Sequence, residues 1–228
     1  MNMETQKSGL DDELTTNVKQ LSFRDLKFIG KQRENTIQLY LCTMARTLTK
    51  QIPLGYEAPS FTLPNVVTNA LTEFGDIKGE KGTVVMFICN HCPFVVHVMD
   101  GLIELGNAYK EKGFGFVAIS SNDVANYPQD RPELMKELAL SKGFPFAYLY
   151  DESQDVAKAY DAECTPDFSI FDANDLCVYR GQLDDSRPGN GIPVTGDSIR
   201  TALDTLETGE VLDQENQKPS IGCNIKWK

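Results

Sequence analysis

The sequence predicts an α/β fold in which helices cover both faces of a mixed central sheet. Three observations predict it. Continuous apolar runs such as 83–89 have the length and composition of buried central strands. Segments with helical spacing of apolar residues lie between these runs, and strands joined through helices favour parallel pairing in one sheet. The chain has 228 residues, 41% of them hydrophobic, which is enough to bury one substantial core.

The first part of the chain differs in texture from the rest. Residues 1–50 are polar and weakly patterned, so we expect an N-terminal extension that is partly helical or disordered. Residues 51–228 form the predicted folded domain with its C-terminal tail, and the core pattern begins near Leu54. We therefore expect the domain to fold without residues 1–43.

The pattern of apolar residues in this domain predicts strands and helices in the order β-β-α-β-α-β-α-β-β-α. Pro93 begins the first long helix, which ends in the Lys- and Gly-rich segment 110–115. The turn sequence "AND" between two late apolar stretches predicts a hairpin. The other expected strands and helices are strands 58–67, 83–89, 114–121, 144–151, 167–172 and 176–183, and helices 130–143, 153–161 and 197–209.

Charge and hydropathy exclude several classes of partner. A formal net charge of -11 argues against a nucleic-acid or anionic-membrane surface. No window approaches the roughly 18 apolar residues of a spanning helix. The N-terminus lacks the basic start and apolar core of a secretory signal, so we expect a cytoplasmic protein. In a reducing cytosol, cysteines are more often catalytic, metal-binding or buried than bridged.

The stretch 87–97, "FICNHCPFVVH", places two of the six cysteines and both histidines at a strand-to-helix junction. Open α/β sheets place their sites at the carboxyl ends of such strands. Pro93 suits the first helical position and makes Cys92 the N-cap residue, where free N–H groups and the helix dipole favour a thiolate. Cys89 lies close enough to form a short-loop disulfide. We predict Cys92 as the nucleophile and Cys89 as its resolving partner.

Two other interpretations of this stretch stay open. In the first, both cysteines are inert small hydrophobic residues of the core. In the second, Cys89, His91, Cys92 and His97 hold copper or zinc, although a second CxxC is absent from the sequence. By itself, His91 is expected to face solvent and tune the thiols, and His97 to pack within its helix. The redox interpretation is preferred, and it requires no cofactor and no metal.

A second motif supports redox chemistry. The stretch 162–172, "AECTPDFSIFD", puts Thr165 and Pro166 directly before a strand. Proline cannot donate to a central ladder, so we expect a special turn with a cis peptide bond that abuts the cysteines. Together with the order of elements and the CxxC junction, this Thr-Pro resembles the thioredoxin fold, in which the proline is cis and faces the cysteines.

Three further stretches narrow the resemblance to the redoxin and peroxiredoxin branch, the alkyl hydroperoxide reductase and thiol-specific antioxidant superfamily. They are "GYEAPSFTLPNV", "YRGQLDDSRPGNG" and "KPSIGCNIKW". The chain is most similar to the peroxiredoxin-like group whose second CxxC cysteine takes the peroxidatic position. The resemblance covers residues 54–228 and implies a thiol-disulfide oxidoreductase, with a thiol reductant or a protein disulfide as partner. It also implies that His91, Pro93, Thr165 and Pro166 line the site.

The same resemblance sets the expectation for peroxide. Typical peroxiredoxins carry Pro and Thr seven and three residues before the peroxidatic cysteine, where this chain has Val85 and Cys89. Those residues position the thiolate and polarise the peroxide, so only slow peroxide reduction, through a Cys92 sulfenic acid resolved by Cys89, is expected as an antioxidant role.

The positions of the remaining cysteines and charged residues in the sequence suggest different roles for them. Cys164 precedes the Thr-Pro turn and is a candidate third redox thiol. Structural roles are expected for Cys42, Cys177 and Cys223. The charges that follow Tyr179 are expected to be solvated, with one or two bordering the pocket; they are Arg180, Asp184, Asp185 and Arg187. The sequence gives no basis for an oligomeric state.

Overall fold

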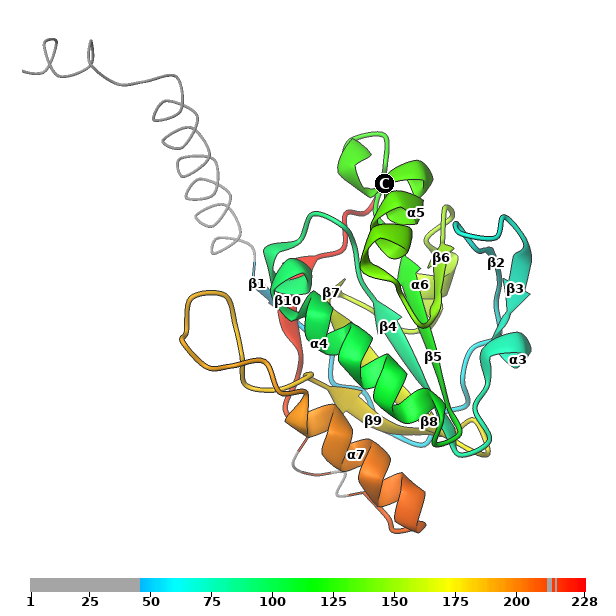
Figure 1. Cartoon of the computed structure of the whole chain (residues 1–228), viewed down its shortest axis with the longest axis vertical. Helices are drawn as coiled ribbons and strands as arrows, with labels where there is room; N and C mark the ends of the chain where they lie inside the picture. Colours follow the sequence, from blue (N-terminus) through cyan, green and yellow to red (C-terminus); the bar gives the residue numbers. More distant parts are fainter. Residues whose placement is uncertain (1–45, 213–214, 216) are drawn as a thin grey trace, which may run out of the picture. The chain divides into compact units, whose positions relative to one another are not determined.

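A computed structural model describes residues 46–212, 215 and 217–228 (Figure 1). Its centre is a five-stranded sheet in the order β6-β5-β4-β8-β9. The first three strands are parallel to one another, and β8 and β9 run antiparallel to their neighbours, so the mixed sheet predicted from the sequence is confirmed. The strands are β4 (Gly82–Phe87), β5 (Phe114–Ser120), β6 (Ala147–Tyr150), β8 (Asp167–Asp172) and β9 (Cys177–Gly181).

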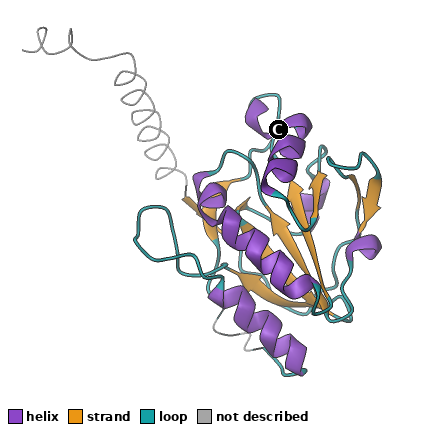
Figure 2. Ribbon diagram, viewed as in Figure 1, coloured by secondary structure: helices purple, strands orange, loops and turns teal. Residues whose placement is uncertain are grey.

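Helices cover both faces of this sheet. Helices α4, α5 and α7 lie in front of it in Figure 2, and Ala157 of α6 belongs to the hydrophobic cluster that holds Val85 and Phe87 of β4. Burial on both faces explains why β4 is a continuous apolar run, since every residue of the strand is buried. The helices are α4 (Pro93–Lys110), α5 (Pro132–Lys142), α6 (Asp155–Ala159) and α7 (Asp197–Thr208).

The strand expected over 58–67 is wrong in extent, and it does not join the central sheet. Only β2 (Thr62–Pro64) forms there, and it pairs with β3 (Leu71–Glu73) in a separate two-stranded sheet. Pro64 lacks an N–H to extend the ladder, and Asn65 turns the chain by accepting from Val67 and Thr68. A short helix, α3 (Phe74–Ile77), follows and was not predicted.

A second small sheet, which the sequence did not predict, joins three distant parts of the chain. Its order is β1-β10-β7, from β1 (Arg46–Leu48), β10 (Ile221–Asn224) and β7 (Cys164–Thr165). All pairs are antiparallel. Each strand has four residues or fewer, so no hydrophobic alternation could be read from the sequence.

Strand β1 also corrects the predicted start of the domain. Its residues fall in the range assigned to the N-terminal extension, yet they pair with the C-terminal tail. The folded unit therefore includes residues before 51. The expectation of a partly helical or disordered extension concerns residues 1–45, and Cys42 with them; these lie outside the described residues.

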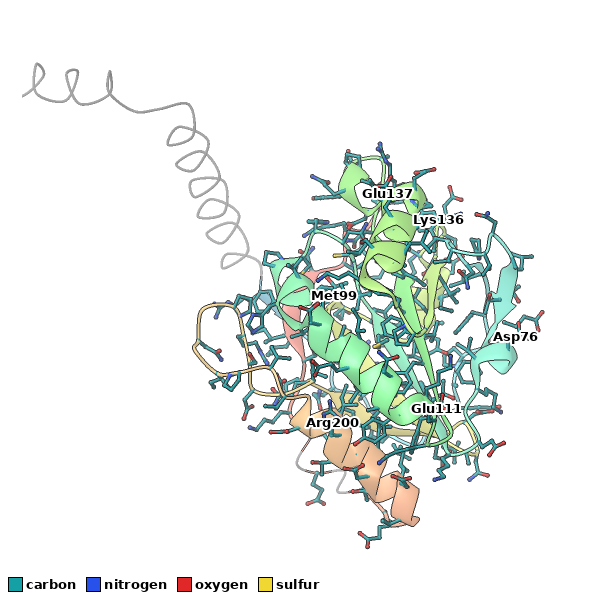
Figure 3. The ribbon with its side chains drawn as sticks, viewed as in Figure 1. Asp76, Met99, Glu111, Lys136, Glu137 and Arg200 are labelled. Atoms are coloured by element: carbon teal, nitrogen blue, oxygen red, sulfur yellow. The ribbon has the colours of Figure 1, made fainter. Side chains whose placement is uncertain are left out.

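The outer surface is rich in charge. Asp76, Glu111 and Glu137 point away from the body of the domain among many other side chains in Figure 3, in keeping with the net charge of -11. Among the described residues, no helix is both long enough and apolar enough to cross a membrane.

Candidate active site

The two cysteines lie where β4 ends and α4 begins. Cys92 is the N-cap residue of α4, with an extended backbone, and Pro93 takes the first helical position as predicted. Cys89 is 1% exposed and Cys92 is fully buried. A substrate therefore reaches either sulfur only after local movement of the surrounding segments.

Both sulfurs contact Thr165. The Cys92 thiol donates to the Thr165 carbonyl oxygen at 3.1 Å, and the Cys89 sulfur lies 3.4 Å from the Thr165 hydroxyl. The Thr165–Pro166 peptide bond is cis, the geometry that the sequence analysis expects. The fold thus brings together the two motifs, which are separated by more than 70 residues.

In the part of the chain that the structure describes, the Cys92 sulfur does not cap the helix by a hydrogen bond, as the sequence analysis expects it to do. Among the described residues, no hydrogen bond from a helix N–H to the Cys92 side chain is found. Instead, its thiol turns toward Thr165, because the carbonyl next to the cis bond offers an acceptor inside the core. Of the features predicted to favour a thiolate, the helix dipole remains and the capping hydrogen bond does not.

The surroundings of the two sulfurs are unequal. Burial raises the pKa of Cys89 well above its ordinary value, and a hydrogen bond to Cys92 and the charge of Asp130 raise it further. The Thr165 hydroxyl acts in the opposite direction and is the weaker influence. Cys89 is therefore held as the thiol, which agrees with the resolving role predicted for it from the sequence.

Asp130 is a functional candidate that the sequence reasoning missed. It is fully buried in a short 3-10 turn (Pro128–Asp130) ahead of α5. Its Oδ1 accepts from the backbone N–H groups of Asn90 and His91 at 2.8 and 3.3 Å, and its Oδ2 accepts from Asn122 at 2.8 Å. The sequence suggested a helix from 130, in which Asp130 is an ordinary first-turn acid. Its contacts with the CxxC loop lie about 40 residues away in the sequence, so no local pattern reveals them.

His91 is not the solvent-facing residue that was expected. Its side chain is 17% exposed, and its Nδ1 lies 2.6 Å from Asp130 Oδ2. The imidazole ring stacks on Tyr127 with a centroid separation of 5.8 Å and an interplanar angle of 7°. Both contacts fix the ring beside the CxxC loop.

His97 belongs to a different part of the molecule, as its packing role predicts. Its Nε2 lies 2.7 Å from the Ser186 hydroxyl, which donates to the Ile192 carbonyl. His97 therefore ties α4 to the loop between β9 and α7. A metal set that needs Cys89, His91, Cys92 and His97 together has no support from this geometry.

A smaller cluster has metal-like spacing. Ligand atoms of Cys89, His91 and Asp130 lie within 4.8 Å of one another. However, the Asp130 oxygens already accept three donors and contact the His91 ring, so a cation would have to displace at least one of these partners. The arrangement is complete as a hydrogen-bonded network.

Cys164 and Cys223 lie behind the Thr-Pro turn. Cys164 is fully buried, its thiol donates to the Pro166 carbonyl at 3.6 Å, and burial raises its pKa well above the ordinary value. Cys223 lies on β10 opposite Thr165, so the C-terminal tail does fold back against the site. Cys177 is buried on β9, where its thiol donates to the Tyr179 carbonyl.

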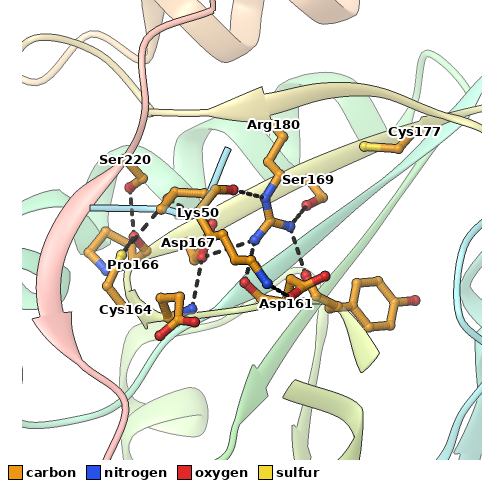
Figure 4. Close-up of polar contacts among 12 residues, drawn as sticks. Lys50, Asp161, Cys164, Pro166, Asp167, Ser169, Cys177, Arg180 and Ser220 are labelled. Carbon is orange, nitrogen blue, oxygen red and sulfur yellow. Dashed lines mark hydrogen bonds and ion pairs between the residues drawn. The ribbon is translucent and has the colours of Figure 1, made fainter. Parts of the chain in front are cut away.

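Arg180 is a structural residue, not a solvated charge as expected. It is 2% exposed and donates to the carbonyl oxygens of Lys50, Tyr160 and Asp161 (Figure 4). Its guanidinium also lies 3.7 Å from the Asp167 carboxylate. These bonds fasten the segment after β1 to the central sheet.

The other three charged residues that follow β9 differ in their surroundings: one is solvated and one borders a pocket, as predicted, and one is buried. Asp185 pairs with Lys218 at the surface. Asp184 is buried and accepts from the N–H groups of Ser186, Thr195 and Gly196, which shapes the loop. Arg187 borders a small pocket beside the cis proline, together with Phe94, Pro166 and Phe168.

Comparisons with known proteins agree with this architecture. The redoxin family profile matches residues 53–197. An uncharacterized conserved protein from Geobacillus kaustophilus is 60% identical, with a TM-score of 0.78 over 80% of this chain and 96% of that one. A hypothetical protein from Sinorhizobium meliloti is 42% identical, with a TM-score of 0.77 over 80% and 98%. A search of curated proteins gave no match.

A more distant likeness concerns the fold alone. The thioredoxin domain of a thiol-disulfide oxidoreductase from Bacteroides vulgatus is 20% identical, with a TM-score of 0.52 over 67% of this chain and 99% of that domain. The fold and the paired cysteines thus define a thioredoxin-like protein. More specifically, the chain belongs to the redoxin family, whose thioredoxin-like oxidoreductases act on thiols and disulfides.

Proposed function

We propose that this protein is a thiol-disulfide oxidoreductase that cycles Cys89 and Cys92 between dithiol and disulfide. The observation that carries the proposal is the meeting of both sulfurs at Thr165, the residue before the cis proline. Two thiols that contact the same residue, one at its carbonyl and one at its hydroxyl, can close a disulfide without long-range rearrangement. The likeness to a thiol-disulfide oxidoreductase of the same fold adds support.

The reaction runs in two exchanges. A Cys92 thiolate attacks the disulfide of the substrate, forms a mixed disulfide and releases the first substrate thiolate. Cys89 then attacks Cys92, closes the internal disulfide and releases the second thiolate. A thiol reductant restores the pair. The raised pKa of Cys89 supports this order, since Cys89 stays protonated while Cys92 reacts first.

Peroxide is the second substrate class in the proposal, at a low rate. Val85 and Cys89 stand in the positions where peroxiredoxins carry Pro and Thr, and both cysteines are buried. Attack by Cys92 would release water and leave a sulfenic acid, which Cys89 would convert to the same disulfide. Cys164 is proposed as a reserve thiol, since its sulfur contacts Pro166 of the same turn.

The test is catalytic turnover of a small disulfide with dithiothreitol as the reductant, together with metal content after purification under reducing conditions. We expect turnover by the wild type and by Cys177→Ser, and none by Cys92→Ser. Absence of turnover in the wild type, with copper or zinc bound at one equivalent and lost in Cys92→Ser, would favour a metal-binding module instead.

A further inference from the structure

The second exchange requires Cys89 to lose its proton at the moment of attack. Thiolates are the nucleophiles of disulfide exchange, whereas burial and the neighbouring groups keep Cys89 protonated. A thiol with a raised pKa attacks slowly near neutral pH unless a nearby base takes its proton. Such a base must lie close to the Cys89 sulfur.

Four titratable groups face Cys89. Cys92 is its partner in the reaction and carries no spare basic site once it is in a mixed disulfide. Tyr148 is fully buried, and burial raises its pKa, so its hydroxyl stays protonated. Asp130 and His91 remain, with ligand atoms within 4.8 Å of the Cys89 sulfur. Such a separation is spanned by direct approach or by one bridging water.

Asp130 is held in place by two segments. The N–H groups of the CxxC loop, at Asn90 and His91, fix its Oδ1, and Asn122, which follows β5, fixes its Oδ2. The His91 ring contacts Oδ2 and is itself clamped against Tyr127. The Lys226 ammonium lies 5.5 Å from the centre of the Tyr127 ring. The carboxylate is thus oriented before any substrate arrives.

We propose that the buried Asp130–His91 pair is the proton acceptor of Cys89 in closure of the internal disulfide. This inference rests on the proposed function. In the step, the Cys89 S–H bond breaks and its proton passes to the pair. The Cys89 sulfur forms a bond to the Cys92 sulfur, the bond from Cys92 to the substrate sulfur breaks, and the substrate leaves as a thiolate with the electron pair.

The test isolates closure from the first exchange. The reduced full chain is mixed with one equivalent of Ellman's disulfide, and the two released thiolates are followed in time between about pH 5 and pH 9. The first release reports the mixed disulfide on Cys92, and the second reports attack by Cys89. In the double variant Cys89→Ser/Cys164→Ser, which also lacks the reserve thiol, the second release should be absent, and this identifies the phase.

We expect Asp130→Asn to slow the second release at neutral pH by about 100-fold, the size of a typical general-base contribution. Its rate should then rise about tenfold per pH unit, since hydroxide must replace the lost acceptor, while the wild type shows a flatter profile. Asp123→Asn is the matched control. It makes the same change on the same loop, where Asp123 accepts from Ala125 and Asn126, and should behave as wild type.

His91→Phe provides a second variant in case Asp130→Asn fails to fold, because phenylalanine preserves stacking on Tyr127. It should slow the second release in the same pH-dependent way. Equal slowing at every pH would indicate a purely structural role and overturn the proposal, as would a wild-type rate in both variants. Stoichiometric Zn²⁺ binding that blocks closure in the wild type but not in Asp130→Asn would also overturn it, in favour of a metal site. A wild type without any second release would instead refute the proposed function itself.

Discussion

Two carboxylates lie buried near the cysteine pair, and they are held in different ways. Asp130 accepts N–H groups from the CxxC loop and contacts an imidazole ring. Asp167, directly after the cis proline, accepts the Thr49 hydroxyl at 3.0 Å and lies 3.7 Å from Arg180. Burial raises the pKa of Asp167 to about 6, despite the opposing effect of Arg180. Asp130 is bonded to the loop that carries the two cysteines. Asp167 is bonded to residues that join the segment after β1 to the central sheet.

The difference shows that burial alone does not mark a catalytic acid. Both side chains are nearly inaccessible, yet the partners of Asp130 belong to the loop between the cysteines, whereas those of Asp167 join β1 to the central sheet. We therefore expect changes at Asp130 to alter both the chemistry and the stability of the CxxC loop, and changes at Asp167 to alter stability alone.

The largest expected effect separates the two cysteines. Cys92→Ser should abolish rapid alkylation of the CxxC pair by iodoacetamide near neutral pH, because burial raises the pKa of the remaining thiol of the pair, Cys89, well above its ordinary value. Cys89→Ser should keep that reactivity and trap mixed disulfides on Cys92. Peptide mapping after timed alkylation gives the measurement. Fast alkylation retained in Cys92→Ser and lost in Cys89→Ser would reverse the two roles.

Cys164 can be tested in the same experiment. If it resolves Cys92 when Cys89 is missing, Cys89→Ser should yield a Cys92–Cys164 bridge. The trapped species would then appear only after the further change Cys164→Ser. Trapping in the single variant alone would assign Cys164 a structural role.

A large loss of stability is expected when the Asp130 acceptor is removed. Asp130→Ala leaves the N–H groups of Asn90 and His91 without their buried partner, which should lower the free energy of unfolding by about 4 kcal/mol. Urea unfolding gives the measurement, with Asp123→Ala as the matched control. An equal loss in the control would show that the CxxC loop does not depend on Asp130.

Asp167 should instead set a pH dependence of stability. Its folded pKa of about 6 exceeds its ordinary value, so the folded state binds the proton more tightly than the unfolded chain. The associated stabilisation is fully present below about pH 4 and is lost as the pH rises through about 6, by about 3 kcal/mol in total. The difference in unfolding free energy between the wild type and Asp167→Asn should show this slope. A difference that does not vary with pH would contradict the raised pKa.

The smallest expected effect concerns the start of the domain. A chain that begins at Met44 retains β1 and the contacts that follow it, so its unfolding should remain cooperative, within about 1 kcal/mol of the full chain. A chain that begins at residue 51 loses the Thr49 bond to Asp167 and the Lys50 carbonyl bond to Arg180, and should be clearly less stable. Equal stability of the two truncations would remove β1 from the folded core.

Much of the fold could be predicted because its signals are local. The apolar run of β4 and Pro93 at the start of α4 placed the CxxC at a strand-to-helix junction, and Pro166 before β8 indicated the special turn. The short strands β1, β7 and β10 were missed, since pairing between distant ends of the chain leaves no periodicity in so few residues.

The site could be predicted only as far as its two motifs. Cys89, Cys92 and Thr165 lie where the sequence analysis placed them, but Asp130 and the buried orientation of His91 did not follow from any spacing. An aspartate ahead of a Pro-initiated helix resembles a common helix start. Asp130 differs from an ordinary helix start only because the fold brings its turn against the CxxC loop, which no local sequence pattern shows.

The most direct test of the central claim is a disulfide map of the reduced protein after one equivalent of an oxidant, either a small disulfide or hydrogen peroxide. We expect a single new bridge between Cys89 and Cys92, formed before any change at Cys164, Cys177 or Cys223. A first bridge that excludes Cys92, or oxidation that leaves both cysteines of the pair as thiols, would contradict it.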